Sequence, residues 1–120
     1  MAKILIVDDE ENIVILTSRI PKRNGYAVVA ATDGSECLRI LEQEKPDLIL
    51  LDVMMPGDDG WVICRKIKEN KKTRDIPVAM FTVRTSEDSV ERSLECAEAQ
   101  IDKPFKSEEL LSVVRRLLKE

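Results

Sequence analysis

Five side chains that can take part in chemistry follow short apolar segments of the chain. They are Asp8, Asp9, Asp52, Thr82 and Lys103. Carboxylates held close together repel one another, at a cost of about 4 kcal/mol for a pair roughly 4 Å apart at an effective dielectric constant of about 20. A hard divalent cation relieves this repulsion. A site with few protein oxygens, completed by water, suits octahedral Mg²⁺ better than a Ca²⁺ cage.

A carboxylate beside Mg²⁺, with an ammonium group and a hydroxyl opposite, suits phosphoryl transfer. The metal and the ammonium group of Lys103 would neutralise the equatorial oxygens of the phosphoryl group, and the hydroxyl of Thr82 would donate a hydrogen bond to one of them. The carboxylate would be the nucleophile, and the product would be an aspartyl phosphate.

Each of these residues also has a simpler explanation. An acid after a strand is often the N-cap of the next helix, which accounts for Asp8 and Asp9 almost as well as a function does. Thr82 alone is typical of a strand end, and Lys103 alone is typical of a solvated charge. Asp52 is harder to explain in this way, because it lies between apolar residues and aspartate is rarely buried unless it is paired. All of them at strand ends together indicate a site.

Four short apolar runs predict the strands that position these residues. They are residues 4–7, 27–30, 48–51 and 78–81, with a weaker fifth run around Gln100 and Ile101. Continuous rather than alternating apolar character is typical of strands that are covered on both faces, as in a parallel sheet. In such folds ligands bind outside the carboxyl ends of the strands, where the strand order switches.

Between the runs, apolar residues at helical spacing predict five helices. These helices are centred on residues 13–20, 37–41, 63–67, 90–97 and 110–118, the last having the clearest apolar stripe. Alternating strands and helices predict an α/β doubly wound fold, in which a βα unit is repeated five times and helices cover both faces of the sheet.

Caps and breakers predict where these helices begin and end. Asn24–Gly25 is predicted to end the first helix, and Asp33–Gly34 to begin the second. Residues 86–88 and 107–109 are typical of N-terminal caps. Pro21 is predicted to break or kink the first helix near its end.

The composition excludes several classes of function. The chain has 120 residues, of which 43% are hydrophobic, and this is predicted to form one domain over residues 1–120. The net charge of −4 makes non-specific binding to nucleic acid or to an anionic membrane surface improbable. The absence of histidine excludes a Ser-His-Asp triad, a histidine-bearing zinc site and a phosphohistidine of the chain's own.

The cysteines and the apolar runs indicate a cytoplasmic protein. Cys37, Cys64 and Cys96 are far apart and form no Cys-x-x-Cys pair, so they are predicted to be small core residues in a reducing cytosol. Lys3 is followed by only four apolar residues, which is too few for a signal peptide, and no run is long enough to insert into a membrane.

Along its whole length the chain resembles the receiver domain of two-component response regulators. The residues that carry the resemblance are Val7–Glu10, Asp52–Gly57 with Gly60, Thr82, and Lys103–Phe105. Each motif alone is weak, but all of them in order with family-like spacing are specific. The resemblance implies a flavodoxin-like fold, a five-stranded parallel sheet with strand order 2-1-3-4-5 in a single domain.

The resemblance also implies a role for each site residue. Asp52 would accept a phosphoryl group from a phosphohistidine on a sensor histidine kinase or a histidine phosphotransfer protein. Asp8, Asp9 and Asp52, with the backbone carbonyl of Met54, would hold Mg²⁺. Thr82 would swing to hydrogen-bond the phosphoryl group, and Lys103 would pair with it. The residue after the lysine, Pro104, is similar to the cis-proline of the family.

Two positions depart from the pattern of the family. Three residues before the lysine the family usually has an aromatic side chain that changes rotamer on phosphorylation, and here Gln100 takes its place. Thr82 is usually followed by a small residue, and here Val83 follows it. The usual coupling between threonine and aromatic residue is therefore not expected to work unchanged. The simpler interpretation of Gln100 is a polar residue at the edge of the sheet.

Two further residues are expected to flank the phosphoryl group. Met54 lies two residues after Asp52, and Arg84 lies two residues after Thr82. Our hypothesis is that both tune the hydrolysis of the acyl phosphate by shaping the access of water. An unchanged dephosphorylation rate after both are exchanged would contradict it.

The resemblance places the signalling surface on the fourth helix, fifth strand and fifth helix, roughly residues 86–120. A downstream effector protein or a second copy of the domain would dock there, since phosphorylation adds about −1.5 to −2 charges and new contacts. No output region follows residue 120, so the chain is expected to be a stand-alone receiver or one domain of a longer protein. It would catalyse only its own phosphorylation and dephosphorylation and would otherwise be a non-enzymatic signalling domain.

Three alternatives stay open. A Mg²⁺-dependent phosphohydrolase also uses an aspartate nucleophile at a strand end, but such enzymes commonly have Asp-x-Asp after the first strand and a cap domain. A degenerate receiver would act only as a phosphorylation-independent protein-binding module; the full acidic set, Thr82 and Lys103 argue against it, while Gln100 and Val83 keep it open. Nucleotide binding is the weakest alternative, because the chain has neither a Gly-x-Gly-x-x-Gly motif nor a Walker lysine loop.

Overall fold

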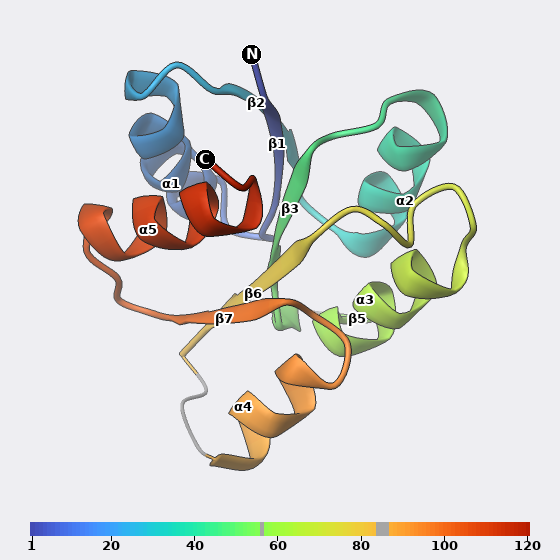
Figure 1. The fold of residues 1–120 in the computed structure, drawn as a ribbon. Coiled ribbons are helices and arrows are strands. Elements are labelled where there is room, and N and C mark those ends of the chain that lie inside the picture. The colour runs from blue at the N-terminus through green and yellow to red at the C-terminus, as the bar shows by residue number, and fades with distance from the viewer. Residues whose placement is uncertain (56, 84–86) are drawn as a thin grey trace.

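The predicted apolar runs form a five-stranded parallel sheet. The computed structural model describes residues 1–55, 57–83 and 87–120. The strands are β1 (Lys3–Val7), β2 (Ala27–Ala31), β3 (Leu48–Asp52), β6 (Val78–Thr82) and β7 (Ala99–Asp102). They lie in the order β2-β1-β3-β6-β7, and all neighbours are parallel (Figure 1). Counted among these five strands alone, this is the predicted order 2-1-3-4-5.

A two-stranded hairpin that the sequence does not predict lies after β3 and accounts for the gap in the numbering. Its strands β4 (Met54–Met55) and β5 (Asp58–Asp59) pair antiparallel. Gly57, between them, has a φ of 76°, a left-handed conformation that glycine adopts without a steric penalty. The hairpin leads directly from the end of β3 into the next helix.

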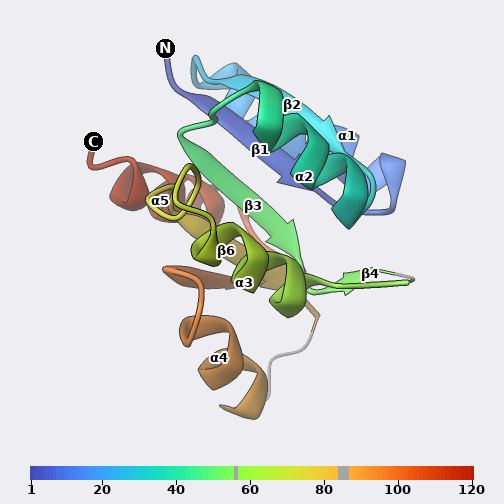
Figure 2. The same ribbon diagram turned by 90° about the vertical axis from the view of Figure 1, so that its right-hand side faces the viewer.

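Five helices cover the two faces of the sheet. They are α1 (Glu11–Arg23), α2 (Gly34–Gln43), α3 (Gly60–Glu69), α4 (Glu87–Leu94) and α5 (Ser107–Leu117). Figures 1 and 2 show α1 and α5 together on one face, α2 and α3 on the other, and α4 beside α3 near β7. The prediction of a βα unit repeated five times is confirmed.

Alternate residues of the strands enter two separate cores. Leu5 and Val7 pack with residues of α2 and α3, whereas Ile4 and Ile6 pack with residues of α1 and α5. Both sets are fully buried, which explains the continuous apolar runs. Cys37 and Cys64 lie in the first core as predicted, but Cys96 is only half-buried at its edge.

Some helix boundaries differ from the predictions. α1 continues through Pro21 and ends at Arg23, so the proline does not break the helix. Asp33 is the N-cap of α2 as predicted, and its side chain accepts a hydrogen bond from the N–H of Glu36. Ser107 is the first residue of α5 and Lys106 is its N-cap, so the predicted serine cap is wrong. Ser86, in the other predicted cap, lies outside the described residues.

In the described part of the chain, no helix combines the length and the apolar character needed to cross a membrane.

Candidate functional site

Asp8 and Asp52 lie side by side because they end neighbouring strands. Asp8 follows β1, Asp52 is the last residue of β3, and β1 and β3 are adjacent at the switch point of the strand order. Both side chains are buried, at 0% and 5% exposure. The N–H of Glu10 donates to Oδ1 of Asp8 at 3.0 Å, and the N–H of Met54 donates to Oδ1 of Asp52 at 3.3 Å.

The explanation of Asp8 and Asp9 as helix caps is wrong. The N-cap of α1 is Glu10, whose own side chain makes no capping hydrogen bond. Asp8 instead turns its carboxylate toward the end of the sheet, and its N–H donates to the carbonyl oxygen of Ala31 at 3.1 Å. Neither acid is therefore the N-cap of the helix that follows it.

Asp8, Asp9 and Asp52 form the predicted acidic cluster. One carboxylate oxygen from each lies within 4.8 Å of the others. Two of the three residues are buried, and Asp9 is half-buried toward the surface. Three hard oxygen donors with one open side suit Mg²⁺, which usually keeps several of its waters. The hydrogen bond to Asp52 brings the backbone of Met54 to this cluster, but the role of its carbonyl as a ligand stays a prediction.

Lys103 supplies the positive charge that opposes the cluster. Its Nζ lies 2.9 Å from Oδ2 of Asp8 and 3.5 Å from Oδ1 of Asp52. The aromatic ring of Phe81 supports the ammonium group, with 4.5 Å between Nζ and the ring centroid. The bond between Lys103 and Pro104 is cis, as the resemblance implies.

Phe81 is a site residue that the sequence pattern does not single out, because its apolar run predicts only a strand. The signal was an aromatic residue directly before Thr82, at the end of a strand that carries functional residues. Because β6 is the neighbour of both β3 and β7, the ring of its penultimate residue can reach the lysine that follows β7.

Thr82 ends β6 and is 1% exposed, so it lies at the same edge of the sheet as the acids. Its backbone carbonyl accepts a hydrogen bond from the N–H of Lys103 at 2.8 Å. Val83, which follows it, is 65% exposed. The inward swing of the threonine hydroxyl stays a prediction. Arg84, the second residue expected to flank the site, lies outside the described residues.

The environment of Asp52 sets its proton affinity. The pKa of this carboxyl is raised from 3.8 to about 6, chiefly by burial; the ammonium group of Lys103 opposes this rise and the charge of Asp8 adds to it. The hydrogen bond from the N–H of Met54 also lowers it. Any further cation at the cluster favours the ionised carboxylate, which is the nucleophilic form.

A cleft of about 700 Å³ leads from the surface to Asp52 and Lys103. Its walls come from α1, from the residues after β3 and β6, and from Pro104 and Phe105. Leu16, Met54 and Val83 line it and are 54%, 48% and 65% exposed. The rim of the cleft around the buried carboxylate is therefore partly apolar.

Comparisons with known proteins all point to one family. The family model of the response regulator receiver domain matches residues 4–115. The alkaline phosphatase synthesis transcriptional regulatory protein PhoP of Bacillus subtilis (strain 168) is 42% identical over 118 residues, which is 98% of this chain. The chain spans about half of that relative, 48% of its length.

Solved receiver domains have the same fold. The signal receiver domain of a signal transduction histidine kinase from Syntrophus aciditrophicus is 39% identical, with a TM-score of 0.91 over 99% of this chain and 91% of that chain. The receiver domain of the sensor histidine kinase PA1611 from Pseudomonas aeruginosa PAO1 is 27% identical, with a TM-score of 0.90 over 99% of this chain and 98% of that chain. The latter structure has a magnesium ion coordinated in its active site cleft.

Proposed function

Since the chain belongs to the response regulator receiver domain family, and is thus a receiver domain of two-component signalling, we propose that Asp52 is its phosphoacceptor. The observation that carries the proposal is a buried carboxylate held between a second buried acid, Asp8, and the ammonium group of Lys103. Such a carboxylate is a preorganised nucleophile that needs only a cation and a phosphoryl donor.

Each residue of the site has a distinct task in this reaction. Asp52 attacks phosphorus with a carboxylate oxygen while the bond from phosphorus to the imidazole nitrogen of the donor breaks, and the released imidazole takes up a proton. Lys103 and the hydroxyl of Thr82 stabilise the negative oxygens of the transferred group. Asp8, Asp9, Asp52 and the carbonyl of Met54 would hold Mg²⁺, which supplies charge neutralisation at the same oxygens.

Receiver domains interact with histidine kinases and effectors, and residues 1–120 contain no histidine that could itself carry the phosphoryl group. We place the phosphohistidine of a sensor histidine kinase or a histidine phosphotransfer protein in the cleft beside Asp52. The exposed Leu16, Met54 and Val83 would contact that partner. Met54 also stands where it can control water access, so it is the described residue expected to affect hydrolysis of the acyl phosphate.

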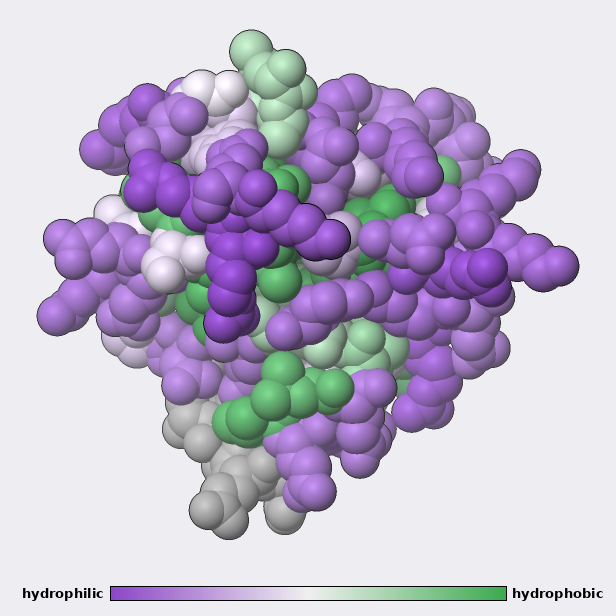
Figure 3. Space-filling view, in the orientation of Figure 1, coloured by the Kyte–Doolittle hydropathy of each residue, from purple (hydrophilic) through white to green (hydrophobic). Residues whose placement is uncertain are grey.

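We place the output surface on α4, β7 and α5. Phosphorylation adds charge and acceptor oxygens next to Lys103, whose N–H is hydrogen-bonded to the carbonyl of Thr82. A change at Thr82 can therefore reach β7 directly. Figure 3 shows an apolar patch over the region of α4 on a surface that is otherwise mostly hydrophilic, and Leu94 of this helix is 52% exposed. An effector protein or a second copy of the domain would bind this surface.

Residues 1–120 would act as one receiver domain in the cytoplasm, without direct binding of nucleic acid. This domain would catalyse only its own phosphorylation and dephosphorylation and would turn over no other substrate. The net charge of −4 agrees with the lack of a nucleic-acid surface.

A second candidate is a degenerate receiver that binds partners without phosphorylation. It is favoured by Gln100, whose Nε2 donates to Oδ1 of Asp102 at 3.1 Å and which supplies no aromatic ring on β7. The complete set of Asp8, Asp9, Asp52 and Lys103 opposes this candidate, because a module that only binds has no need for buried acids beside a lysine.

One experiment tests the proposal. The protein is incubated with Mg²⁺ and acetyl phosphate, and its intact mass is measured beside Asp52→Asn and the control Asp75→Asn, in which an exposed acid away from the site is changed. We expect a gain of one phosphoryl group in the wild type and the control and none in Asp52→Asn. No gain in the wild type, together with no binding of beryllofluoride, would instead support the degenerate module.

A further inference from the structure

Few of the side chains that the structure describes in helix α4 are buried against the rest of the domain. Of its residues Val90–Leu94, whose side chains the structure describes, Ser93 is the one that is buried, at 0% exposure. Leu94 is 52% exposed and Arg92 is also exposed. A helix without a large buried apolar face depends on specific contacts for its position, and such elements can shift at low cost.

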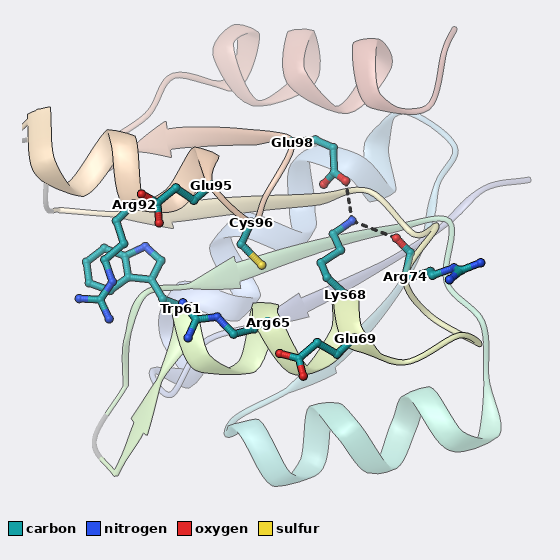
Figure 4. Close-up of a pocket in the computed structure, with 9 residues that line it drawn as sticks. All are labelled: Trp61, Arg65, Lys68, Glu69, Arg74, Arg92, Glu95, Cys96 and Glu98. Carbon is teal, nitrogen blue, oxygen red and sulfur yellow. Dashed lines mark hydrogen bonds and ion pairs between the residues drawn. The ribbon is translucent and has the colours of Figure 1, made fainter.

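Those specific contacts converge on Trp61 in the first turn of α3. Its side chain is 5% exposed, and its indole N–H donates to Oγ of Ser93 at 3.0 Å. The guanidinium carbon of Arg92 lies 4.2 Å from the centroid of the Trp61 ring, an arrangement visible in Figure 4. Arg92 also reaches Asp59, the N-cap of α3, with 3.9 Å between Nη2 and Oδ2. We call the Trp61, Arg92 and Ser93 contacts the α3–α4 latch.

Gly60, the first residue of α3, packs directly against the backbone of Asp52. The N–H of Gly60 donates to the carbonyl oxygen of Val53 at 2.9 Å. A Cβ on Gly60 would lie 2.2 Å from the carbonyl oxygen of Asp52, so the two backbones are in direct contact. Any shift of the backbone at Asp52 and Val53 therefore moves Gly60, and Trp61 is the next residue.

We infer that Trp61 is a positioning residue that couples the occupancy of Asp52 to the position of α4 through the α3–α4 latch. The inference rests on the proposed function and adds to it a route on the α3 side of the sheet, separate from the route through Thr82 and Lys103. Coupling between two sites is reciprocal, so weakening the latch must change the affinity of Asp52 for a phosphoryl analogue. Arg92 and Ser93 both act through Trp61. The effects of substitutions at these two residues on that affinity are therefore not independent.

The test uses Mg²⁺ with beryllofluoride as the probe and Trp61 as the reporter, since it is the single tryptophan of the chain. Ser93→Ala removes the hydrogen-bond acceptor of the indole, and Arg92→Gln removes the stacked cation. The matched control Arg65→Gln removes the same charge from the wall of the same cavity between α3 and α4, whose volume is about 460 Å³. Arg92 and Arg65 are both exposed, so these two variants are expected to fold even if Ser93→Ala does not.

We expect saturating beryllofluoride to change the emission of Trp61 in the wild type and in Arg65→Gln. Ser93→Ala is expected to shift the dissociation constant of beryllofluoride by about five- to tenfold, and Arg92→Gln by about two- to fivefold in the same direction. The double variant, with Ser93→Ala and Arg92→Gln, is expected to shift this dissociation constant by less than the product of the two single-variant shifts. Rescue of the wild-type affinity in Ser93→Thr, which keeps the hydroxyl, supports a specific hydrogen bond.

Several results would overturn the inference. The first is an emission of Trp61 that does not change when beryllofluoride binds to the wild type. The second is a pair of beryllofluoride dissociation constants for Arg92→Gln and Arg65→Gln that agree within twofold. The third is a double variant of Ser93 and Arg92 whose shift in dissociation constant equals the product of the two single shifts. In these cases the wild type still binds the probe and the proposed function stands. A wild type that binds no beryllofluoride refutes the proposed function, and the inference that rests on it falls as well.

Discussion

The Cα of Gly60 lies against the backbone carbonyl of Asp52, so closely that a Cβ at position 60 would meet this oxygen at 2.2 Å. The same Cβ would lie 2.7 Å from the Cα of Val53. Both contacts are with backbone atoms, which cannot rotate away as a flexible side chain can. The start of α3 is thereby fixed to the end of β3, at the residue proposed to accept the phosphoryl group.

Gly60→Ala is expected to destabilise the domain by about 2 to 3 kcal/mol, since overpacking forces the backbone to shift. It is also expected to slow phosphorylation by acetyl phosphate, because the shift falls on Asp52. Urea unfolding gives the first quantity and intact mass against time gives the second. Gly25→Ala is the control, because its cost of about 1 kcal/mol comes from a φ of 87° and no atom lies within 4 Å of the new Cβ. Equal phosphorylation rates in both variants would contradict this prediction.

The sequence predicts the main sheet and its site because both depend on strong local signals. The runs at residues 4–7 and 48–51 are continuously apolar and become β1 and β3. The acids Asp8 and Asp52 follow from the position of strand ends alone, since parallel strands bring their carboxyl ends to one edge. Order and spacing are therefore sufficient to predict that these two acids meet, although they do not reveal the contact of Phe81 with Lys103.

Other features depend on contacts that the sequence does not display. Two-residue strands such as β4 have no periodicity, so the pairing of β4 with β5 could not be predicted from the sequence pattern. Pro21 stays within α1 because it lies in the last turn, where its ring disturbs few helical hydrogen bonds. The contact of Trp61 with Ser93 joins residues 32 positions apart on different helices, and only the fold reveals it.

Asp52→Asn is expected to stabilise the metal-free protein at neutral pH. The pKa of Asp52 is raised from 3.8 to about 6 in the folded state, so folding favours the protonated form. Stability from this group is complete below pH 4 and is lost as the pH rises through about 6. Asp52→Asn has no carboxylate at this position. Its free energy of unfolding therefore exceeds that of the wild type by at most about 3 kcal/mol at pH 7.5, and this difference disappears below pH 4. Urea unfolding in EDTA at pH 3.5, 5 and 7.5 measures the difference, and a constant difference at all three would contradict the raised pKa.

Mg²⁺ is expected to stabilise the wild type through the acidic cluster. A ligand that binds only the folded state adds about 2.7 kcal/mol at one hundred times its dissociation constant. Asp9→Asn removes a half-buried member of the cluster, whose three carboxylates lie within 4.8 Å, and should abolish most of the gain. Asp75→Asn makes the same charge change at an exposed position and should keep the gain. Thermal unfolding with and without Mg²⁺ measures the effect, and an equal loss of stabilisation in both variants would show that general charge, not the cluster, is responsible.

Lys103→Met is expected to raise the pKa of Asp52 above its value of about 6, because the ammonium group now lowers it from 3.5 Å away. The variant leaves Asp8 buried without its cation, which adds to the repulsion at Asp52. Titration of the side-chain carboxyl carbon of Asp52 by NMR, in the absence of metal, measures this pKa. Phosphorylation by acetyl phosphate should also fall by about tenfold or more, the cost of losing a charge-assisted hydrogen bond to the transferred group.

The control for this variant is Lys106→Met, which removes the same charge from an exposed residue three positions later. Its Asp52 should titrate as in the wild type, because exposed charges are screened by water and salt. A pKa of Asp52 that stays near 6 in Lys103→Met would mean that the ammonium group of Lys103 does not lower it. Lys103 would then matter only for the incoming phosphoryl group, and the phosphorylation rate would fall without a change in the titration.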